Sequence, residues 1–156
     1  KDEVEDKDRI VTGWGASLSG IWQFAENTSL CFQGVYGKGI SNYIQDISGS
    51  GLDLVPSATA EGKLKAFNAW GGYIGFSHNW SKVLTSNIMY SYARALDRYG
   101  MPATSYKYAQ YAAANLFWDF SEYGSCAIEY VFGRRNDFNK DYGNASRINT
   151  MIQYRF

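Results

Sequence analysis

The last eleven residues, 146–156, place the strongest constraint on the fold, because apolar and polar side chains alternate along them. Aromatic residues, isoleucine and threonine occupy most of the even positions, and arginine, asparagine and glutamine most of the odd ones. Successive side chains of a β-strand point to opposite faces, so this period predicts a strand with one apolar and one polar face. About ten residues also suffice for a tilted strand to cross a bilayer. Soluble sandwiches can end in such a strand too, so this segment alone leaves both classes open.

Composition narrows the class of protein. Of the 156 residues, 17% are aromatic and 19% are charged, and the formal net charge is zero. A neutral chain has no basic field to attract nucleic acid, and no segment reaches the roughly 18 apolar residues of a membrane-spanning helix. Abundant aromatic residues and glycines with few prolines are typical of a membrane β-barrel, in which half of each strand faces water.

Six further segments alternate in the same way, so the sequence predicts seven antiparallel strands. Tight turns follow the first, third and fifth strands, and longer connections, 38–62, 96–104 and 136–145, follow the others. Short turns on one rim and long loops on the other are the layout of an antiparallel transmembrane β-barrel. A soluble, lipocalin-like ligand-binding barrel with an aromatic core is the alternative.

Aromatic residues gather at both ends of the predicted strands. Tyr92 and Phe132 lie toward the long loops, and four lie near the tight turns or the terminus: Trp22, Trp80, Trp118 and Phe156. Such side chains are enriched where a barrel meets the two membrane–water interfaces, so the pattern predicts two aromatic girdles.

The direction of the strands predicts a partner. If the last strand descends to the periplasm, the first begins outside the cell, whereas bacterial barrels have an even number of strands and both ends in the periplasm. The charged run 1–8 is then expected to be an extracellular loop or tail remnant, and residues 9–156 a barrel segment. The N-terminal part of the same barrel, missing or supplied as a separate chain, is expected to pair with it.

Residues suited to enzymatic or metal chemistry are sparse. His78 is the one histidine, and no second His or Cys stands at metal-ligand spacing. Cys31 and Cys126 are predicted on opposite faces of non-neighbouring strands, which disfavours a disulfide. We therefore expect no metal, no cofactor and no catalytic site. An outer-membrane barrel enzyme with His78 as its base, or an adhesin, is the alternative.

The polar faces of the strands predict the lining of a pore. Four basic side chains are predicted to point inward: Lys107, Arg135, Arg147 and Arg155. Glu129 lies among them and can pair with Arg147 or Arg155, which still leaves an excess of positive charge. Charged rings in a channel select ions by sign. The other predicted pore-lining residues are Tyr73, Tyr111, Asn115, Asn149 and Gln153.

The connection 38–62 is unusually long for a compact domain, which makes it a candidate functional loop. Folded into a lumen, it would narrow the pore and bring Asp46 and Asp53 toward the lumenal cations. An external cover that packs on a neighbouring subunit is the alternative.

Several segments resemble the C-terminal half of the DcaP-like outer-membrane porins. They are 13–20 (GWGASLSG), 35–44 (VYGKGISNYI), 69–76 (AWGGYIGF) with His78 and Trp80, 114–118 (ANLFW), 128–135 (IEYVFGRR) and 145–149 (ASRIN). The resemblance implies a sixteen-stranded, homotrimeric porin in the Gram-negative outer membrane, in contact with lipid and lipopolysaccharide. It also implies passage of small hydrophilic solutes, often anionic or dicarboxylic. The seven strands would be the C-terminal part of such a barrel.

Overall fold

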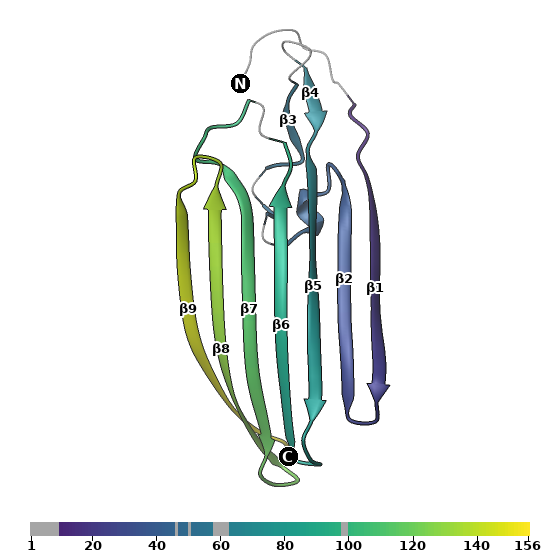
Figure 1. The fold of residues 1–156 in the computed structure, drawn as a ribbon, viewed down its shortest axis with the longest axis vertical. Helices are drawn as coiled ribbons and strands as arrows, with labels where there is room; N and C mark the ends of the chain where they lie inside the picture. The colour runs from purple at the N-terminus through teal and green to yellow at the C-terminus, as the bar shows by residue number, and fades with distance from the viewer. Residues whose placement is uncertain (1–9, 46, 50, 58–62, 98–99) are drawn as a thin grey trace.

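The computed structural model describes residues 10–45, 47–49, 51–57, 63–97 and 100–156. In these ranges seven strands form one antiparallel sheet in the order β1-β2-β5-β6-β7-β8-β9 (Figure 1). Their bounds are β1 Trp14–Ala25, β2 Thr28–Lys38, β5 Asn68–Asn79, β6 Leu84–Ala95, β7 Tyr106–Asp119, β8 Gly124–Asp137 and β9 Tyr142–Tyr154. The predicted all-β segment of seven antiparallel strands is confirmed. Within the described ranges, no helix is long and apolar enough to cross a membrane.

β1 and β9 are the two edges of this sheet. Each of the other strands pairs with a neighbour on both sides, but in the described part of the chain β1 and β9 do not pair with each other. The sheet is therefore open, and it does not close around a core of its own.

The pairing register sorts the side chains into two faces. A row across β2, β5, β6, β7 and β8 consists of Phe32, Ile74, Tyr90, Ala112 and Phe132. The adjacent row, one residue away on each strand, consists of Gln33, Tyr73, Ser91, Tyr111 and Gly133. We call the face that bears the first row the apolar face and the other the polar face.

Large side chains of the apolar face are open to the surroundings. Ile152 is 85% exposed, Leu18 71% and Ile148 67%. A lipocalin-like barrel turns its apolar side chains inward, where they are covered. A broad exposed apolar band is instead what a membrane barrel presents to lipid.

Aromatic rings form one belt of the apolar face beside the long loops. The ring centroids of Trp14 and Tyr36 are 5.7 Å apart. Tyr92 lies between Trp70 and Tyr108, with centroid separations of 5.0 and 5.5 Å. We call this group the upper belt.

A second belt lies beside the tight turns. There the ring centroid of Phe24 is 5.7 Å from that of Trp22 and 6.0 Å from that of Phe76. Tyr108 of the upper belt and Trp118, beside the tight turns, stand ten residues apart on β7. That spacing is about 33 Å along a strand, or about 25 Å across the membrane at a tilt of about 40°. The separation matches the apolar band of an outer-membrane barrel.

The connections at the two rims differ in length, with one departure from the prediction. Residues 26–27, 80–83 and 120–123 make tight turns at the rim where the chain ends (Figure 1). The expected long connection 136–145 is only 138–141.

Interactions across β8 and β9 explain the shorter connection. Asn136 pairs with Tyr142 in the ladder, and the Arg134 guanidinium lies 4.3 Å from the centre of the Tyr142 ring. The Asp137 N–H donates to the Asp141 carbonyl at 2.9 Å. Lys140 adopts a φ of 75°, which tightens the turn.

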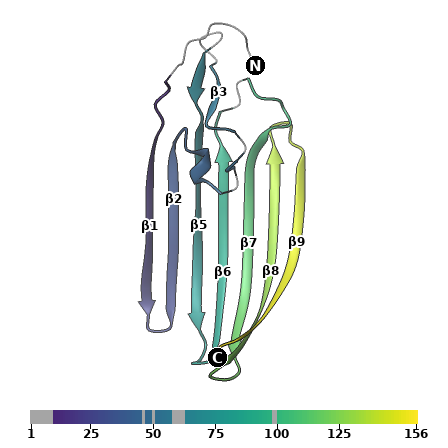
Figure 2. The ribbon, with the colours of Figure 1, turned by 180° about the vertical axis from the view of Figure 1, so that it is seen from behind.

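The connection between β2 and β5, residues 39–67, folds over the polar face, and we call it the inserted loop. It contains the 3-10 turn η1 (Ser41–Tyr43) and the hairpin β3 (Leu54–Pro56) with β4 (Leu64–Ala66). Figure 2 shows η1 in front of β5, whereas in Figure 1 it lies behind the sheet.

The inserted loop is anchored by a cluster of buried side chains. Ile40, Ile44, Ile47, Val55 and Phe67 come from the loop and pack with Ala69, Ala93, Ala95 and Tyr106 of the strands. The alanines leave room on the polar face for the isoleucines and the phenylalanine. These described residues of the loop are thus packed against the sheet over several strands, whereas the hairpin of β3 and β4 lies beyond the long-loop ends of β2 and β6 (Figure 1).

Phe67→Ala should release the inserted loop. Phe67 is 0% exposed, and removal of a buried phenylalanine side chain costs about 3–5 kcal/mol. We expect limited proteolysis of the complete barrel to cleave the loop much faster in this variant. Leu64→Ala, at a residue 53% exposed, is the control and should behave like the parent. Equal protease resistance in Phe67→Ala and the parent would contradict this packing.

Candidate pore lining and constriction loop

A row of hydrogen-bonded side chains crosses four strands of the polar face. The Asn87 amide donates to Asn115 Oδ1 at 2.8 Å. The amides of Asn115 and Asn149 donate to the two carboxylate oxygens of Glu129, at 3.4 and 2.9 Å. These side chains are consecutive partners in the ladders of β6 to β9. The network fixes a hydrophilic band on the predicted pore wall.

Glu129 has partners different from those expected. The sequence predicted a pair with Arg147 or Arg155, but the carboxylate is hydrogen-bonded to the two asparagine amides. Arg147 lies opposite Val131 in the next row and is exposed. Arg155 follows the end of β9, where its N–H donates to the Tyr123 carbonyl at 2.8 Å.

Arg135 forms an ion pair on the polar face near the long loops. Its Nε donates to Asp137 Oδ1 at 2.9 Å, and its guanidinium lies 5.7 Å from the centre of the Tyr106 ring. Because the Asp137 side chain is 21% exposed and that of Arg135 58%, the pair is partly screened by solvent.

The predicted excess of positive charge on this wall is wrong for the seven strands. Asp119, opposite Ser125, also belongs to the polar face. Within the strands, the register places two basic residues on this wall, Arg135 and Arg147, and three acidic ones, Asp119, Glu129 and Asp137. Arg155 follows the end of β9, and the numbers are equal if it continues the alternation of that strand. The wall is therefore balanced in charge, although some of its charged groups form ion pairs or hydrogen bonds and others are exposed.

Lys107 is not in the lumenal set. The register of β7 and β8 shifts between Tyr106 and Tyr108, so Lys107 sits at an irregularity that interrupts the alternation. Its Nζ lies 5.9 Å from the centre of the Tyr108 ring, which belongs to the upper belt of the apolar face. The strict period of two assumed from the sequence fails at this position.

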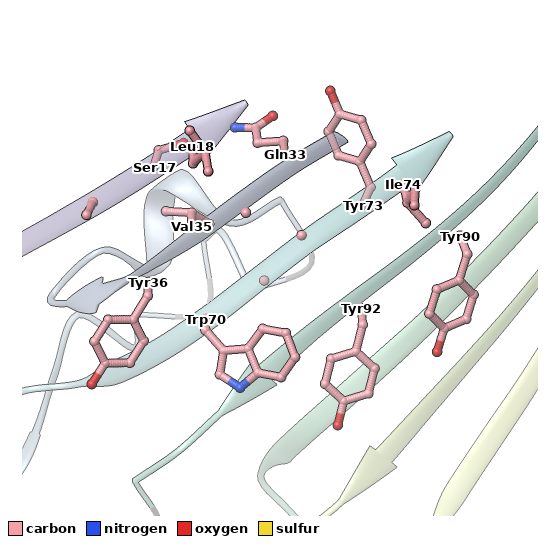
Figure 3. A pocket seen from close by; sticks show the side chains of 14 residues that line it. Ser17, Leu18, Gln33, Val35, Tyr36, Trp70, Tyr73, Ile74, Tyr90 and Tyr92 are labelled. Atoms are coloured by element: carbon pink, nitrogen blue, oxygen red, sulfur yellow. The ribbon is translucent and has the colours of Figure 1, made fainter. Parts of the chain in front are cut away.

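The other predicted lining residues fall on the polar face by register. Tyr73 pairs with Ser91, which pairs with Tyr111 in turn, and Ser125 pairs with Gln153. Figure 3 shows Tyr73 and Gln33 projecting from the sheet on the side opposite Tyr36 and Trp70.

Part of the inserted loop is separated from this wall by a cavity beside Tyr73. A cavity of about 250 Å³ lies between Tyr43, Ile44 and Gln45 of the loop and the wall residues Gln33, Tyr73 and Ser91, among others. Tyr43 is 83% exposed, and Gln45 is also exposed. These two side chains stand at the free edge of the loop, and the sequence did not single them out.

A sequence signal for the loop does exist. Ile40, Ile44 and Ile47 have the spacing of one face of a helical turn, and all three are buried. That face anchors the loop, so the residues between the isoleucines point elsewhere. Tyr43 and Gln45 are such residues.

Asp53 organises the loop. Its Oδ1 accepts hydrogen bonds from the Ser41 N–H at 3.0 Å and the Ser41 hydroxyl at 2.6 Å, and its Oδ2 accepts one from the Asn42 amide at 2.8 Å. Both carboxylate oxygens are thus engaged inside the loop, in place of the lumenal cation that the sequence suggested. Asp46, the other predicted constriction residue, lies outside the described residues.

Neither His78 nor the cysteines form a reactive cluster. His78 lies between Phe76 and Trp80, and its Nδ1 is 2.8 Å from the Thr28 hydroxyl. Cys31 and Cys126 are free thiols. Among the described residues, no group of His, Cys, Asp and Glu side chains could hold a metal ion.

Comparison with known proteins supports the fold. No protein-family model matches the chain, and no curated protein sequence matches it significantly. The structure is similar to the crystal structure of the outer membrane channel DcaP of Acinetobacter baumannii, with a TM-score of 0.74 and 18% sequence identity. The fold is that of part of the DcaP barrel. The match covers 92% of this chain and 41% of that one, so this chain spans less than half the length of the channel it matches. The fold predicted from the sequence resemblance is confirmed.

The two cysteines provide a test of the faces. Cys31 lies on the polar face between Ile21 and Gly75, and Cys126 on the apolar face between Trp118 and Ile152. In the complete barrel in liposomes, we expect a small charged thiol reagent to label Cys31, and a lipid-soluble maleimide to label Cys126.

The matched controls are Cys31→Ser and Cys126→Ser. Each should abolish labelling by one reagent and leave labelling by the other unchanged. Labelling of Cys126 by the charged reagent, with Cys31 protected, would reverse the assignment of the faces.

Proposed function

We propose that this chain forms part of an outer-membrane porin through which small hydrophilic solutes diffuse. The observation that carries the proposal is the position of the inserted loop on the polar face of a sheet whose opposite face exposes its apolar side chains. A wall that is wet on one side and apolar on the other separates water from lipid. The likeness in fold to an outer membrane channel supports the same function.

The open edges of the sheet support a larger barrel. In hydrocarbon, unpaired N–H and C=O groups are too costly to leave without partners, so membrane sheets close into barrels. We infer that further strands of the same barrel pair with β1 and β9. A barrel of sixteen strands, a homotrimer and the Gram-negative outer membrane, with lipid and lipopolysaccharide around it, follow from the sequence resemblance and belong to this proposal.

The inserted loop is proposed to form the constriction of the pore. Its core packs on Ala69, Ala93 and Ala95, so the loop occupies part of the lumenal cross-section near the long-loop rim. Tyr43 and Gln45, at its free edge, are then the loop side chains that solutes meet. Asp53 acts indirectly, because it holds η1 in place.

An anion preference is proposed to depend on Arg147. Glu129 is bound by two amides and Asp137 by Arg135, whereas Arg147 is exposed opposite Val131. A guanidinium group binds carboxylates through two parallel hydrogen bonds, which suits short dicarboxylates. Because the wall as a whole is balanced, we expect the preference to be modest and local.

Reversal potentials across planar bilayers test this role of Arg147. A unit charge acting across about 8 Å of water contributes about 0.5 kcal/mol, which salt at physiological strength reduces to about 0.2 kcal/mol. Because the charge acts in opposite senses on anions and cations, their permeability ratio changes roughly twofold. Arg147→Gln should shift the ratio of the complete barrel toward cations by about this factor, and Glu129→Gln should shift it toward anions. Arg134→Gln, on the apolar face, is the control and should have no effect. An unchanged ratio in Arg147→Gln would remove this residue from the mechanism.

A disulfide tests the position of the loop. Ile44 Cγ2 lies 3.2 Å from the position that a Cβ on Gly71 would occupy, so Ile44→Cys and Gly71→Cys should form a disulfide in the complete barrel. If the loop already lies there, oxidation should leave the single-channel conductance nearly unchanged.

The matched control joins Ile44→Cys with Gly133→Cys. Gly133 is on the polar face, and a Cβ there meets nothing within 4 Å, so this pair should not form a disulfide. Failure of the Ile44–Gly71 pair to crosslink, or a large change in conductance on oxidation, would place the functional loop elsewhere.

A further inference from the structure

A groove runs across the apolar face where two glycines face each other. Gly34 pairs with Gly72, and Leu18 and Tyr92 complete the same row on either side. A Cβ at Gly34 would meet nothing within 4 Å, so the floor of the groove is bare. The hollow here has a volume of about 920 Å³.

Aromatic and aliphatic side chains form the walls of this groove. Tyr36 and Trp70 stand in the row on the long-loop side, and Ile74 stands in the row on the other side. Figure 3 shows Tyr36, Trp70 and Tyr92 projecting on the same side of the sheet. The groove is therefore apolar and lies just below the upper aromatic belt.

Basic side chains stand directly above the groove. Arg94 lies between Trp70 and Tyr108 in the ladders, and interacts electrostatically with Tyr92. Lys107 Nζ lies 5.9 Å from the centre of the Tyr108 ring. Lys38 and Arg134 belong to the same face by register.

Within the seven strands, no acidic residue balances these charges on the apolar face. The seven strands are fully described, and their register places every Asp and Glu that they contain on the polar face. Cations on the lipid-facing side of a barrel are costly in hydrocarbon, but they are favourable at the interface, where they can reach anionic headgroups.

We propose that the groove and the basic residues above it bind a phosphate-bearing lipid. Its phosphate contacts Arg94 and Lys107, and one acyl chain lies over Gly34 and Gly72. The guanidinium of Arg94 can bind phosphate through two hydrogen bonds, and the long basic side chains can extend to the headgroup level. Bare glycines give an acyl chain a slot that a side chain would fill.

Charge decides between a lipid and a second copy of the chain. Whichever part of its lipid-facing surface a second copy used, its seven strands would bring basic residues but no carboxylate, because none of their Asp and Glu residues lies on the apolar face. A phosphorylated lipid supplies both the negative charge and the apolar chain. This inference rests on the proposed membrane orientation, in which the long loops face outward and the lipid is that of the outer leaflet, lipid A.

Native mass spectrometry of the complete barrel, titrated with lipid A, tests the site. We expect Arg94→Gln and Lys107→Gln each to weaken lipid A binding about fivefold, since a basic residue near a membrane surface contributes about 1 kcal/mol. Lys82→Gln, in a tight turn at the opposite rim, should leave binding unchanged. Dephosphorylated lipid A should bind more weakly to the parent and be insensitive to Arg94→Gln.

Gly34→Leu tests the groove separately, because it adds a side chain to the slot at a position where a Cβ meets no atom within 4 Å. It should weaken binding of lipid A and of its dephosphorylated form alike. Parent-like lipid A binding in Arg94→Gln and Lys107→Gln would overturn the proposal. So would a Gly34→Leu variant that changes the number of subunits but retains lipid, because the groove would then be a subunit contact. Single-channel recordings of the same samples distinguish failure of the lipid site from failure of the proposed porin function. If the variants bind lipid A like the parent and the channels conduct, only the lipid site is refuted.

Discussion

The rest of the structure depends on the pairing of backbone N–H and C=O groups between antiparallel strands. Hydrocarbon offers no water to these groups, so a chain that crosses it must satisfy them within a helix or a closed sheet. In the described ranges, the seven strands of the main sheet satisfy these groups through six adjacent strand pairs. The outer edges of β1 and β9 have no partner there. Once the register is set, the period of two fixes which side chains face lipid and which face the lumen.

Small residues on the polar face allow the second main feature, the inserted loop. Ala69, Ala93 and Ala95 leave a shallow bed into which Ile47 and Phe67 pack, each 0% exposed. Small residues also occupy the apolar face at Gly34 and Gly72, where they leave a groove open. In both places, residues with a small side chain or none determine the shape of the wall. The loop fills one such space from within the chain, and we propose that a lipid fills the other.

The strands and their faces could be predicted because alternation is a local property of the sequence. The shorter β8–β9 connection could not, since the polar residues around Asn136 and Gly143 are typical of a loop but pair in register. Lys107 was misplaced by a register shift that no local pattern indicates. Asp53 was assigned to the lumen by its charge alone, whereas its partners Ser41 and Asn42 lie about ten residues away, beyond the reach of a periodicity argument.

The most direct test of the account is a spin-label scan of β9 in the complete barrel in liposomes. Single cysteines at consecutive positions 146–153 would carry the label, and collisions with oxygen and with a charged nickel chelate would be measured at each. We predict two oscillations with a period of two and opposite phase: oxygen contact highest at Ser146, Ile148, Thr150 and Ile152, and nickel contact highest at Arg147, Asn149, Met151 and Gln153. Oscillations of the reverse phase, or none, would contradict it.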